Sequence, residues 1–306
     1  MSNYHGVLPV WKPEDWTSHD VVAKVRRLIW EKRIGHTGTL DPKVVGVLPL
    51  CIGKATRIVE YLQEMPKQYE ATLRFGVSTD TEDLSGEVLE RSDASHLTEE
   101  MIRETILSFI GDIEQVPPMY SAVKVDGKRL YDLAREGKTV ERKARQVTIH
   151  NIDLLDVQLG TSEPEVRFLV ECSKGTYIRT LCVDIGRKLG VPSTMAKLMR
   201  TVSAGFVPSQ CVTFDQIEQA VADGTFETML LSVEDAISDM PRIQVSEKFA
   251  HYALTGRSIP LHALQPKPLT NGTIRLYDEQ GTFYGIFQVP QGQSVLRPVK
   301  VFLPNE

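Results

Sequence analysis

An amphipathic helix is the first clear pattern along the chain. Residues 6–11 form an apolar run that ends at Lys12-Pro13, and apolar residues then recur at helical spacing, at Val21, Val22, Val25, Leu28 and Ile29. The positions between them are largely basic, and Thr17 or Ser18 precedes the helix where a capping side chain is needed. The pattern predicts a strand over 6–11 and a capped helix that ends at about residue 30, with one buried face.

Later segments alternate between strand and helix patterns. Tyr69, Leu73 and Phe75 fall on one face of an alternating segment over 69–77, and further strands are predicted over 146–157 and 165–172. Helices are predicted over 54–62 and 98–111, from near Arg179 to about Leu189, and within 212–247. From residue 242 short strands dominate, over 274–277, 283–287 and 297–303, which predicts a small β-barrel-like unit of about 60 residues at the C-terminus.

Composition is typical of a soluble globular protein with one large and one small domain. The chain has 306 residues, 42% of them hydrophobic, and no apolar run near the roughly 20 residues needed to span a bilayer. The first residues lack a signal-peptide pattern, so we expect a cytoplasmic protein. Cys51, Cys172, Cys182 and Cys211 form no C-x-x-C pair, which indicates neither a zinc site nor a disulfide framework.

Charge is unevenly distributed although the net charge is only -5. Three segments are basic, at 23–36, 121–150 and 172–200, whereas 76–104 and 212–247 are acidic. One basic face with acidic flanks would suit a phosphate backbone, and solvated helix faces would give the same pattern.

The octapeptide from Gly35 to Pro42, Gly-His-Thr-Gly-Thr-Leu-Asp-Pro, is the strongest candidate for chemistry. Its glycines tolerate positive φ, and Pro42 disfavours a helical Asp41, so a tight loop is expected to present this carboxylate. The apolar run between Gly46 and Gly53 predicts a buried strand that anchors the loop. An ordinary Asp-Pro turn is the alternative, and neither a P-loop nor a phosphoryl-aspartate motif fits the surrounding residues.

Two other segments stand out. Residues 120–145 are basic, contain Tyr120 and Tyr131, and have an Asp126-Gly127 turn typical of a hairpin. They would form either an ordinary hairpin and helix or a segment that closes over nucleic acid. Arg179 lies near the start of a predicted helix, where the helix dipole disfavours a cation, so an anionic partner would explain it better than helix stability does.

Taken together, these residues resemble the bacterial tRNA pseudouridine-55 synthases, the TruB family. The matches run in order along nearly the whole chain and include Lys12-Pro13, the octapeptide, Tyr69, Thr79-Asp80-Thr81, Pro118 to Ala122 and Cys172 to Arg179. The resemblance implies an α+β fold: a catalytic domain over 1–240 with a mixed, mainly antiparallel sheet and an RNA-clamping insertion at about 120–145. It also implies a β-rich, PUA-like RNA-binding domain over 241–306.

The resemblance also implies a reaction and a set of roles. Uridine 55 in the T-loop of tRNA would be flipped out, cleaved from ribose and rejoined through carbon, with no cofactor, no metal and no obligatory protein partner, by a monomer. Asp41 would be the essential carboxylate, Arg179 its ionic partner, and Tyr69 the residue that stacks on the base and is a candidate to accept the proton from C5. The remaining implied RNA contacts are His36, which would fill the space the nucleotide leaves, Tyr177 and Leu198 in the pocket, and the clamping insertion, where the candidate phosphate contacts are Lys128 and Arg129.

Two functions from other classes compete with this one. A non-catalytic RNA chaperone on the same fold would bind RNA without isomerising it. A hydrolase that uses Asp41 would need a second carboxylate or a histidine base, and the octapeptide offers only His36.

Overall fold

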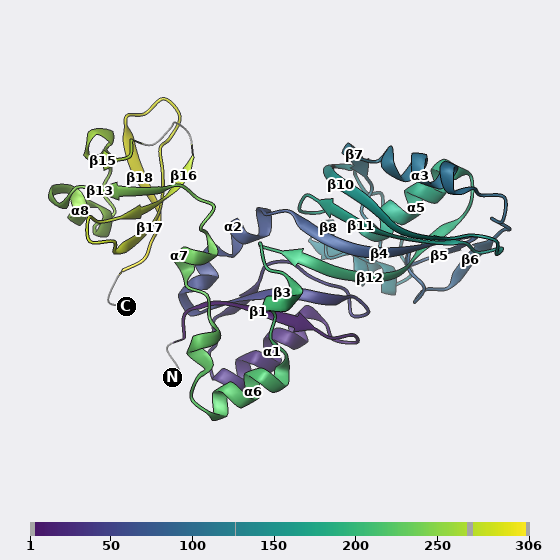
Figure 1. Cartoon of the computed structure of the whole chain (residues 1–306), viewed down its shortest axis with the longest axis horizontal. Helices are drawn as coiled ribbons and strands as arrows, with labels where there is room; N and C mark the ends of the chain where they lie inside the picture. The colour runs from purple at the N-terminus through teal and green to yellow at the C-terminus, as the bar shows by residue number, and fades with distance from the viewer. Residues whose placement is uncertain (1–3, 126, 268–271, 304–306) are drawn as a thin grey trace.

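A single eight-stranded sheet forms the centre of the molecule (Figure 1). The computed structural model describes residues 4–125, 127–267 and 272–303. The strand order is β1-β3-β12-β4-β11-β10-β7, and β2 pairs with β3; every pairing is antiparallel except β3 with β12. The predicted mainly antiparallel α+β fold is therefore confirmed. The strands are β1 (Gly6–Lys12), β2 (Ile34–His36), β3 (Val45–Ile52), β4 (Lys67–Phe75), β7 (Gly111–Gln115), β10 (Arg145–Gln158), β11 (Glu165–Cys172) and β12 (Ser193–Ser203).

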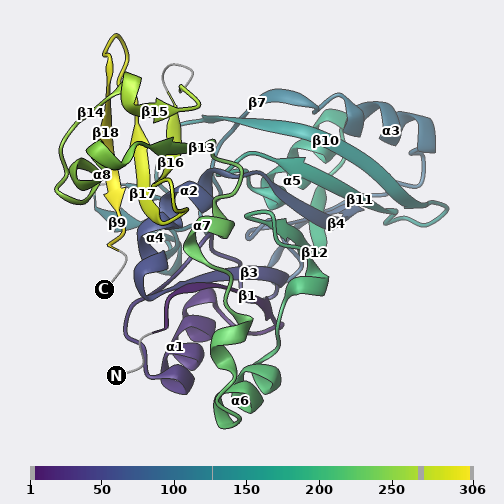
Figure 2. The same ribbon diagram turned by 60° about the vertical axis from the view of Figure 1, so that its left-hand side comes forward.

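Helices lie against both ends of this sheet (Figures 1 and 2), and each end has its own hydrophobic core. At one end α1 (Ser18–Ile29) and α6 (Phe214–Ala222) pack together against β1 and β3. At the other end α3 (Glu99–Leu107) and α5 (Ile178–Leu189) cover β4, β10 and β11. The predicted start of α1 is confirmed, because Thr17 Oγ1 accepts a hydrogen bond from Asp20 N at 3.0 Å while Asp20 Oδ2 accepts from Thr17 N at 2.9 Å.

The inner strand β12 is an element that the hydrophobic pattern did not predict. Bulges against β4, between Met195 and Lys197 and between Arg200 and Val202, break its alternation, so that Lys197 is exposed and Arg200 is buried. Arg200 lies beside Gly46 of β3, which has φ +122°, and a Cβ at Gly46 would overlap the backbone of Arg200. Glycine is thus required where β3 and β12 meet, directly below the octapeptide loop.

Two small hairpins project from the sheet. The acidic hairpin, residues 77–91, contains β5 (Val77–Thr79) and β6 (Val88–Arg91), neither of which was predicted. The arm, residues 120–145, contains β8 (Lys124–Val125), β9 (Lys128–Arg129) and α4 (Leu130–Arg135), as predicted. Asp126, at the predicted turn of the arm, lies outside the described residues.

A second, six-stranded sheet ends the chain, with strand order β14-β18-β17-β16-β13-β15 (Figure 2). The strands predicted over 274–277, 283–287 and 297–303 are confirmed. The strands of this sheet are β13 (Arg242–Val245), β14 (Ile259–Pro260), β15 (Leu264–Gln265), β16 (Thr273–Tyr277), β17 (Phe283–Gln288) and β18 (Val295–Val301), and α8 (Glu247–Leu254) packs on them. Within the stretch 212–247, α-helix covers α6, α7 (Val233–Ala236) and Glu247, the first residue of α8.

The second sheet is packed on the first through a shared apolar cluster. Ile286 and Phe302 join Val7, Ile58 and Leu62 in this cluster. Ile58 belongs to a 3-10 turn (Gly53–Ile58), and Leu62 belongs to α2 (Val59–Glu64). Within the described ranges, no helix is long and apolar enough to cross a membrane.

Candidate active site

The loop that carries Asp41 is held on both sides of the aspartate. It connects β2 to β3, and Leu40 N donates a hydrogen bond to Ser18 Oγ at 2.9 Å. On the other side, the Lys12 ammonium donates to Pro42 O at 3.0 Å. Because Ser18 begins α1 and Lys12 ends β1, two elements of the core fix the backbone next to the carboxylate.

Lys12 is fully buried although it is charged, and its ammonium also donates to Pro13 O at 2.9 Å and Trp16 O at 2.6 Å. Burial lowers the pKa of Lys12 to about 8, so the side chain remains mostly protonated at neutral pH. A neutral lysine would lose one of these three N–H···O contacts. The protonated form therefore suits its position as a clamp on the loop.

Arg179 connects Asp41 to two other segments. The first turn of α5 places its guanidinium, only 6% exposed, with Nη2 at 2.9 Å from Asp41 Oδ2. Nη2 also donates to Tyr120 O at 2.8 Å, and Nη1 donates to Thr81 O at 2.9 Å. A second carboxylate, Asp83, lies 4.0 Å from Nη1. The structure thus supplies the anionic partner that was inferred for Arg179, and joins it to the base of the arm and to the acidic hairpin.

The protonation of Asp41 reflects two opposing influences. Its side chain keeps 44% of its own surface exposed, yet it lines a cavity in which the surrounding protein buries the carboxylate. This burial raises the pKa of Asp41, and the Asp83 charge acts in the same direction, whereas Arg179 and then Lys12 act to lower it. Arg179 is therefore the main group that favours the ionised carboxylate.

Three further predicted residues line the cavity above Asp41. The cavity has a volume of about 320 Å³, and Tyr69, Tyr177 and Leu198 are among its lining residues. Tyr69 and Leu198 come from neighbouring strands β4 and β12 and also pack on the core at the α5 end of the sheet. Gln115 fixes the backbone of Tyr177 by accepting from its N–H at 3.0 Å and donating to its carbonyl at 3.2 Å. The structure therefore gathers Asp41, Tyr69, Tyr177, Arg179 and Leu198 around one space.

Arg200, which was not predicted as a site residue, supports the cavity from below. It is 1% exposed, and its guanidinium donates to Val47 O at 2.8 Å and to Gly38 O at 3.1 Å, which ties the octapeptide loop to β3. It also lies beside the phenol of Tyr69. Burial raises the pKa of Tyr69, and the Arg200 charge opposes this rise.

His36 lies outside the cavity that contains Asp41. Its Nδ1 accepts from Gly38 N at 3.3 Å, and its ring meets that of His19 edge-on at 5.8 Å between centroids. Burial lowers the pKa of His36 to about 4, with smaller contributions from His19 and Arg200, so the imidazole is neutral at pH 7. A neutral, half-buried ring beside the loop is compatible with an apolar contact to RNA, which stays a prediction.

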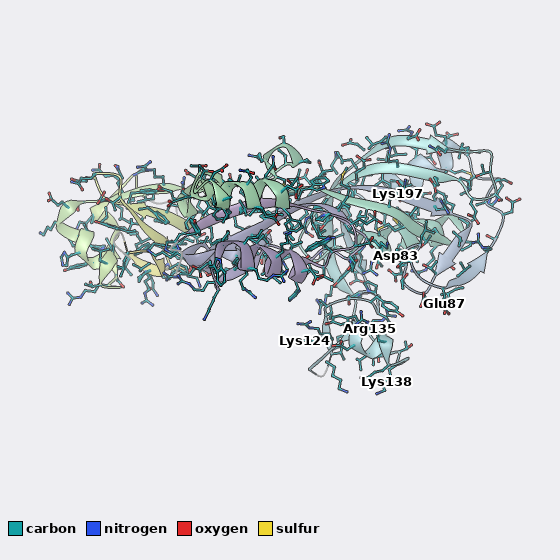
Figure 3. The ribbon with its side chains drawn as sticks, turned by 90° about the horizontal axis from the view of Figure 1, so that it is seen from below. Asp83, Glu87, Lys124, Arg135, Lys138 and Lys197 are labelled. Carbon is teal, nitrogen blue, oxygen red and sulfur yellow. The ribbon has the colours of Figure 1, made fainter. Side chains whose placement is uncertain are left out.

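Lys128 and Arg129 are exposed on β9 of the arm. Arg129 lines a second cavity of about 840 Å³ between the arm and the body, and Asp41 and Arg179 line its other side. Lys128 lines neither cavity. Figure 3 shows Lys124, Arg135 and Lys138 on the projecting arm, with Asp83 near its base and Glu87 on the acidic hairpin. The cleft between arm and body therefore has one basic wall.

Asp83 and Arg200 are two charged site residues that sequence reasoning missed. Asp83 follows the Thr79-Asp80-Thr81 motif by two residues, so the motif pointed to its neighbourhood but not to its side chain. Arg200 lies on the strand that was not predicted, and no local pattern distinguishes it from a surface arginine. Only the pairing of β12 with β3 and β4 brings it under the loop.

Comparison with known families accounts for most of the chain. Residues 26–178 match the model for the TruB family pseudouridylate synthase N-terminal domain, and residues 179–238 match the tRNA pseudouridylate synthase B C-terminal domain. A tRNA pseudouridine synthase B of Bacillus cereus is 44% identical over 305 residues, covering 98% of both chains. The corresponding protein of Oceanobacillus iheyensis is 43% identical over 300 residues, covering 97% of both.

Solved structures show the same fold over nearly the full length. The chain superposes with a TM-score of 0.75 on a chain of a Cbf5-Nop10-Gar1 complex, at 26% identity, covering 98% of this chain and 86% of the other. A chain of an H/ACA RNP bound to a substrate RNA containing 2'-deoxyuridine gives a TM-score of 0.74 at 23% identity, covering 99% and 86%. At 23% identity, this second match shows a shared fold only.

Proposed function

Because the chain belongs to the TruB family and is a pseudouridine synthase, we propose that it isomerises uridine 55 in the T-loop of tRNA. The observation that carries this proposal is the Asp41–Arg179 ion pair in the lining of a cavity that Tyr69 also lines. The cavity has room for a flipped base, and its tyrosine and leucine walls offset part of the stacking that the base loses, which costs a few kcal/mol.

In the proposed reaction the bond from ribose C1′ to N1 breaks and a bond from C1′ to C5 forms. The C5 proton is lost and N1 gains one, so no oxidant, reductant or phosphate donor is required, and no cofactor is proposed. The carboxylate of Asp41 either attacks C1′ or promotes elimination to a glycal-like intermediate, and both routes start from its ionised form. Arg179 favours that form and fixes the direction of the carboxylate.

Tyr69 is proposed to stack on the target base and to accept the proton from C5. Its position beside Leu198 on the cavity wall supports stacking. Proton acceptance requires the phenolate, which burial disfavours and the charge of Arg200 favours. Tyr69 and Arg200 would therefore work as a unit in that step.

The remaining predicted residues would hold the RNA around the flipped nucleotide. We propose that His36 fills the space it leaves, that Tyr177 and Leu198 contact the base, and that the arm clamps the T-loop. Residues 241–306 would form a PUA-like RNA-binding domain attached to the catalytic domain of residues 1–240. We propose that the protein acts in the cytoplasm as a monomer and needs no protein partner.

The experiment that tests the function is tritium release from a tRNA transcript labelled at C5 of every uridine. We expect release of one tritium per tRNA, and none when uridine 55 is replaced by cytidine. Release that persists with this replacement would refute specificity for position 55, and tight binding without release from either transcript would favour the chaperone.

The arm is expected to contact phosphates through its exposed cations. Replacing Lys128 and Arg129 with alanine should weaken tRNA binding and reduce the slope of log Kd against log salt by about 1 to 2, because each phosphate contact releases counterions. Filter binding at several salt concentrations measures both quantities. Arg103→Ala with Arg187→Ala removes the same charge from α3 and α5, behind the sheet, and serves as the matched control. Equal slopes in both double variants would exclude phosphate contact at the arm.

A further inference from the structure

A basic cavity lies at the opposite end of β3 from Asp41. It has a volume of about 250 Å³ and is formed where β3 runs into Gly53 and the end of the C-terminal sheet packs on the body. His5, Arg33, Lys54, Arg57 and Phe302 line it, and it shares no residue with the lining of the cavity above Asp41. The eight residues of β3 separate the two sites by roughly 25 Å.

The backbone shapes this cavity around His5. Gly53 has φ +60°, and a Cβ there would overlap the His5 ring, so glycine is needed for the histidine to occupy this place. Lys54 N donates to His5 Nδ1 at 3.3 Å, which leaves the proton of the neutral ring on Nε2. Among the described residues, the buried Nε2 has no hydrogen-bond acceptor.

The charge in the cavity is positive. Arg33 is 60% exposed and lies 3.7 Å from Glu31 Oε1, which neutralises it in part. Arg57 donates to Val301 O at 2.5 Å and stacks on the Phe302 ring at 4.8 Å. No carboxylate in the described ranges pairs with its guanidinium. No carboxylate within those ranges pairs with Lys54 either. Burial, followed by the charges of Lys54 and Arg33, lowers the pKa of His5, which is consistent with this excess of positive charge.

We propose that this cavity binds a phosphate group of the RNA backbone, at a second contact outside the catalytic site. Lys54 and Arg57, which have no carboxylate partner in the described ranges, and Arg33, which Glu31 neutralises only in part, are the cations that a phosphate would neutralise. The position supports RNA as the source, because the cavity lies between the catalytic body and the C-terminal sheet. This inference rests on the proposed function, in which tRNA is the substrate.

The distance between the two sites provides the test. A stem–loop of about five base pairs that carries the target uridine offers few phosphates at the roughly 25 Å that separates Asp41 from the basic cavity. Full-length tRNA continues well beyond that stem and offers many more. Arg33→Ala with Lys54→Ala should therefore weaken binding of full-length tRNA about tenfold, the size expected for two lost phosphate contacts, and leave binding and isomerisation of the stem–loop unchanged.

Arg26→Ala with Arg27→Ala is the matched control, since both side chains are exposed on the nearby helix α1 and neither lines the cavity. Full-length tRNA binding that weakens only in the Arg33/Lys54 variant would support the inference. Equal losses on tRNA and stem–loop would indicate structural damage and overturn it. An inactive wild-type protein on both RNAs would instead count against the proposed function.

Inorganic phosphate distinguishes the two sources of the ligand. If the wild type alone is stabilised against thermal unfolding by millimolar phosphate, and tRNA binding is equal in both double variants, the cavity takes free phosphate and the assignment to RNA is wrong. If neither phosphate nor tRNA distinguishes the Arg33/Lys54 variant from the wild type, the site itself is refuted.

Discussion

Asp41→Asn is expected to lower the rate of pseudouridine formation by about 10⁴-fold or more while tRNA binding stays within about twofold of the wild type. Asparagine has the same size and can retain the contact with Arg179 Nη2 through its amide oxygen. It has no ionised oxygen to attack or stabilise C1′, so binding and chemistry should separate. Tritium release under single-turnover conditions measures the rate, and filter binding measures the affinity.

Asp153→Asn provides the control, because it makes the same chemical change at an exposed position on β10. It should leave both quantities unchanged. Comparable release from Asp41→Asn and the wild type would exclude Asp41 as the essential carboxylate. A large loss of binding in Asp41→Asn would show that the carboxylate acts in RNA recognition before any chemistry.

The parts of this site that the sequence predicted are those set by local chemistry. The capping of α1 by Thr17 depends on residues three apart, and the buried strand after the octapeptide depends on an apolar run between two glycines. Asp41 was identified in the same way, from the unusual composition of its own loop. Such features are expressed within one turn or one strand, so periodicity and turn chemistry reveal them.

The parts that were missed depend on pairings between distant segments. β12 is an inner strand of the sheet, but its two bulges and the charged Lys197 and Arg200 hide any alternation. Asp83 approaches Arg179 only because the acidic hairpin folds toward α5. Neither the pairing of β12 nor the approach of Asp83 to Arg179 produces a recognisable pattern in the local sequence. The resemblance to the TruB family identified Asp41 as the partner of Arg179, whereas the position of Arg179 near a helix start predicted only an anionic partner.

Arg179 also explains how the arm and the catalytic loop are joined. Its guanidinium contacts Asp41, the carbonyl of Tyr120 at the base of the arm and the carbonyl of Thr81 in the acidic hairpin. A shift of the arm when RNA binds would therefore alter the contact between Arg179 and Asp41, which orients the carboxylate. The arm and the catalytic aspartate share one buried side chain, so a variant of that side chain should affect both RNA binding and chemistry.

Arg179→Met should lower kcat at neutral pH by about 10²- to 10³-fold and move the acidic limb of the pH–kcat profile to higher pH. Burial and Asp83 both raise the pKa of Asp41, and Arg179 is the strongest group that lowers it. Without the guanidinium the pKa rises further, so at any given pH a smaller fraction of Asp41 is ionised, and higher pH restores more of the activity.

Arg179→Lys separates the charge of this side chain from its geometry. The ammonium should return the acidic limb toward that of the wild type, because a cation again lies near Asp41, but it cannot reproduce the fork that reaches the carboxylate and two carbonyls at once. We therefore expect KM for tRNA to stay raised in the lysine variant, since the base of the arm loses its anchor. Arg187→Met, on the exposed face of the same helix, should leave kcat, KM and the pH profile unchanged. An unshifted acidic limb in Arg179→Met would show that Arg179 does not control the ionisation of Asp41.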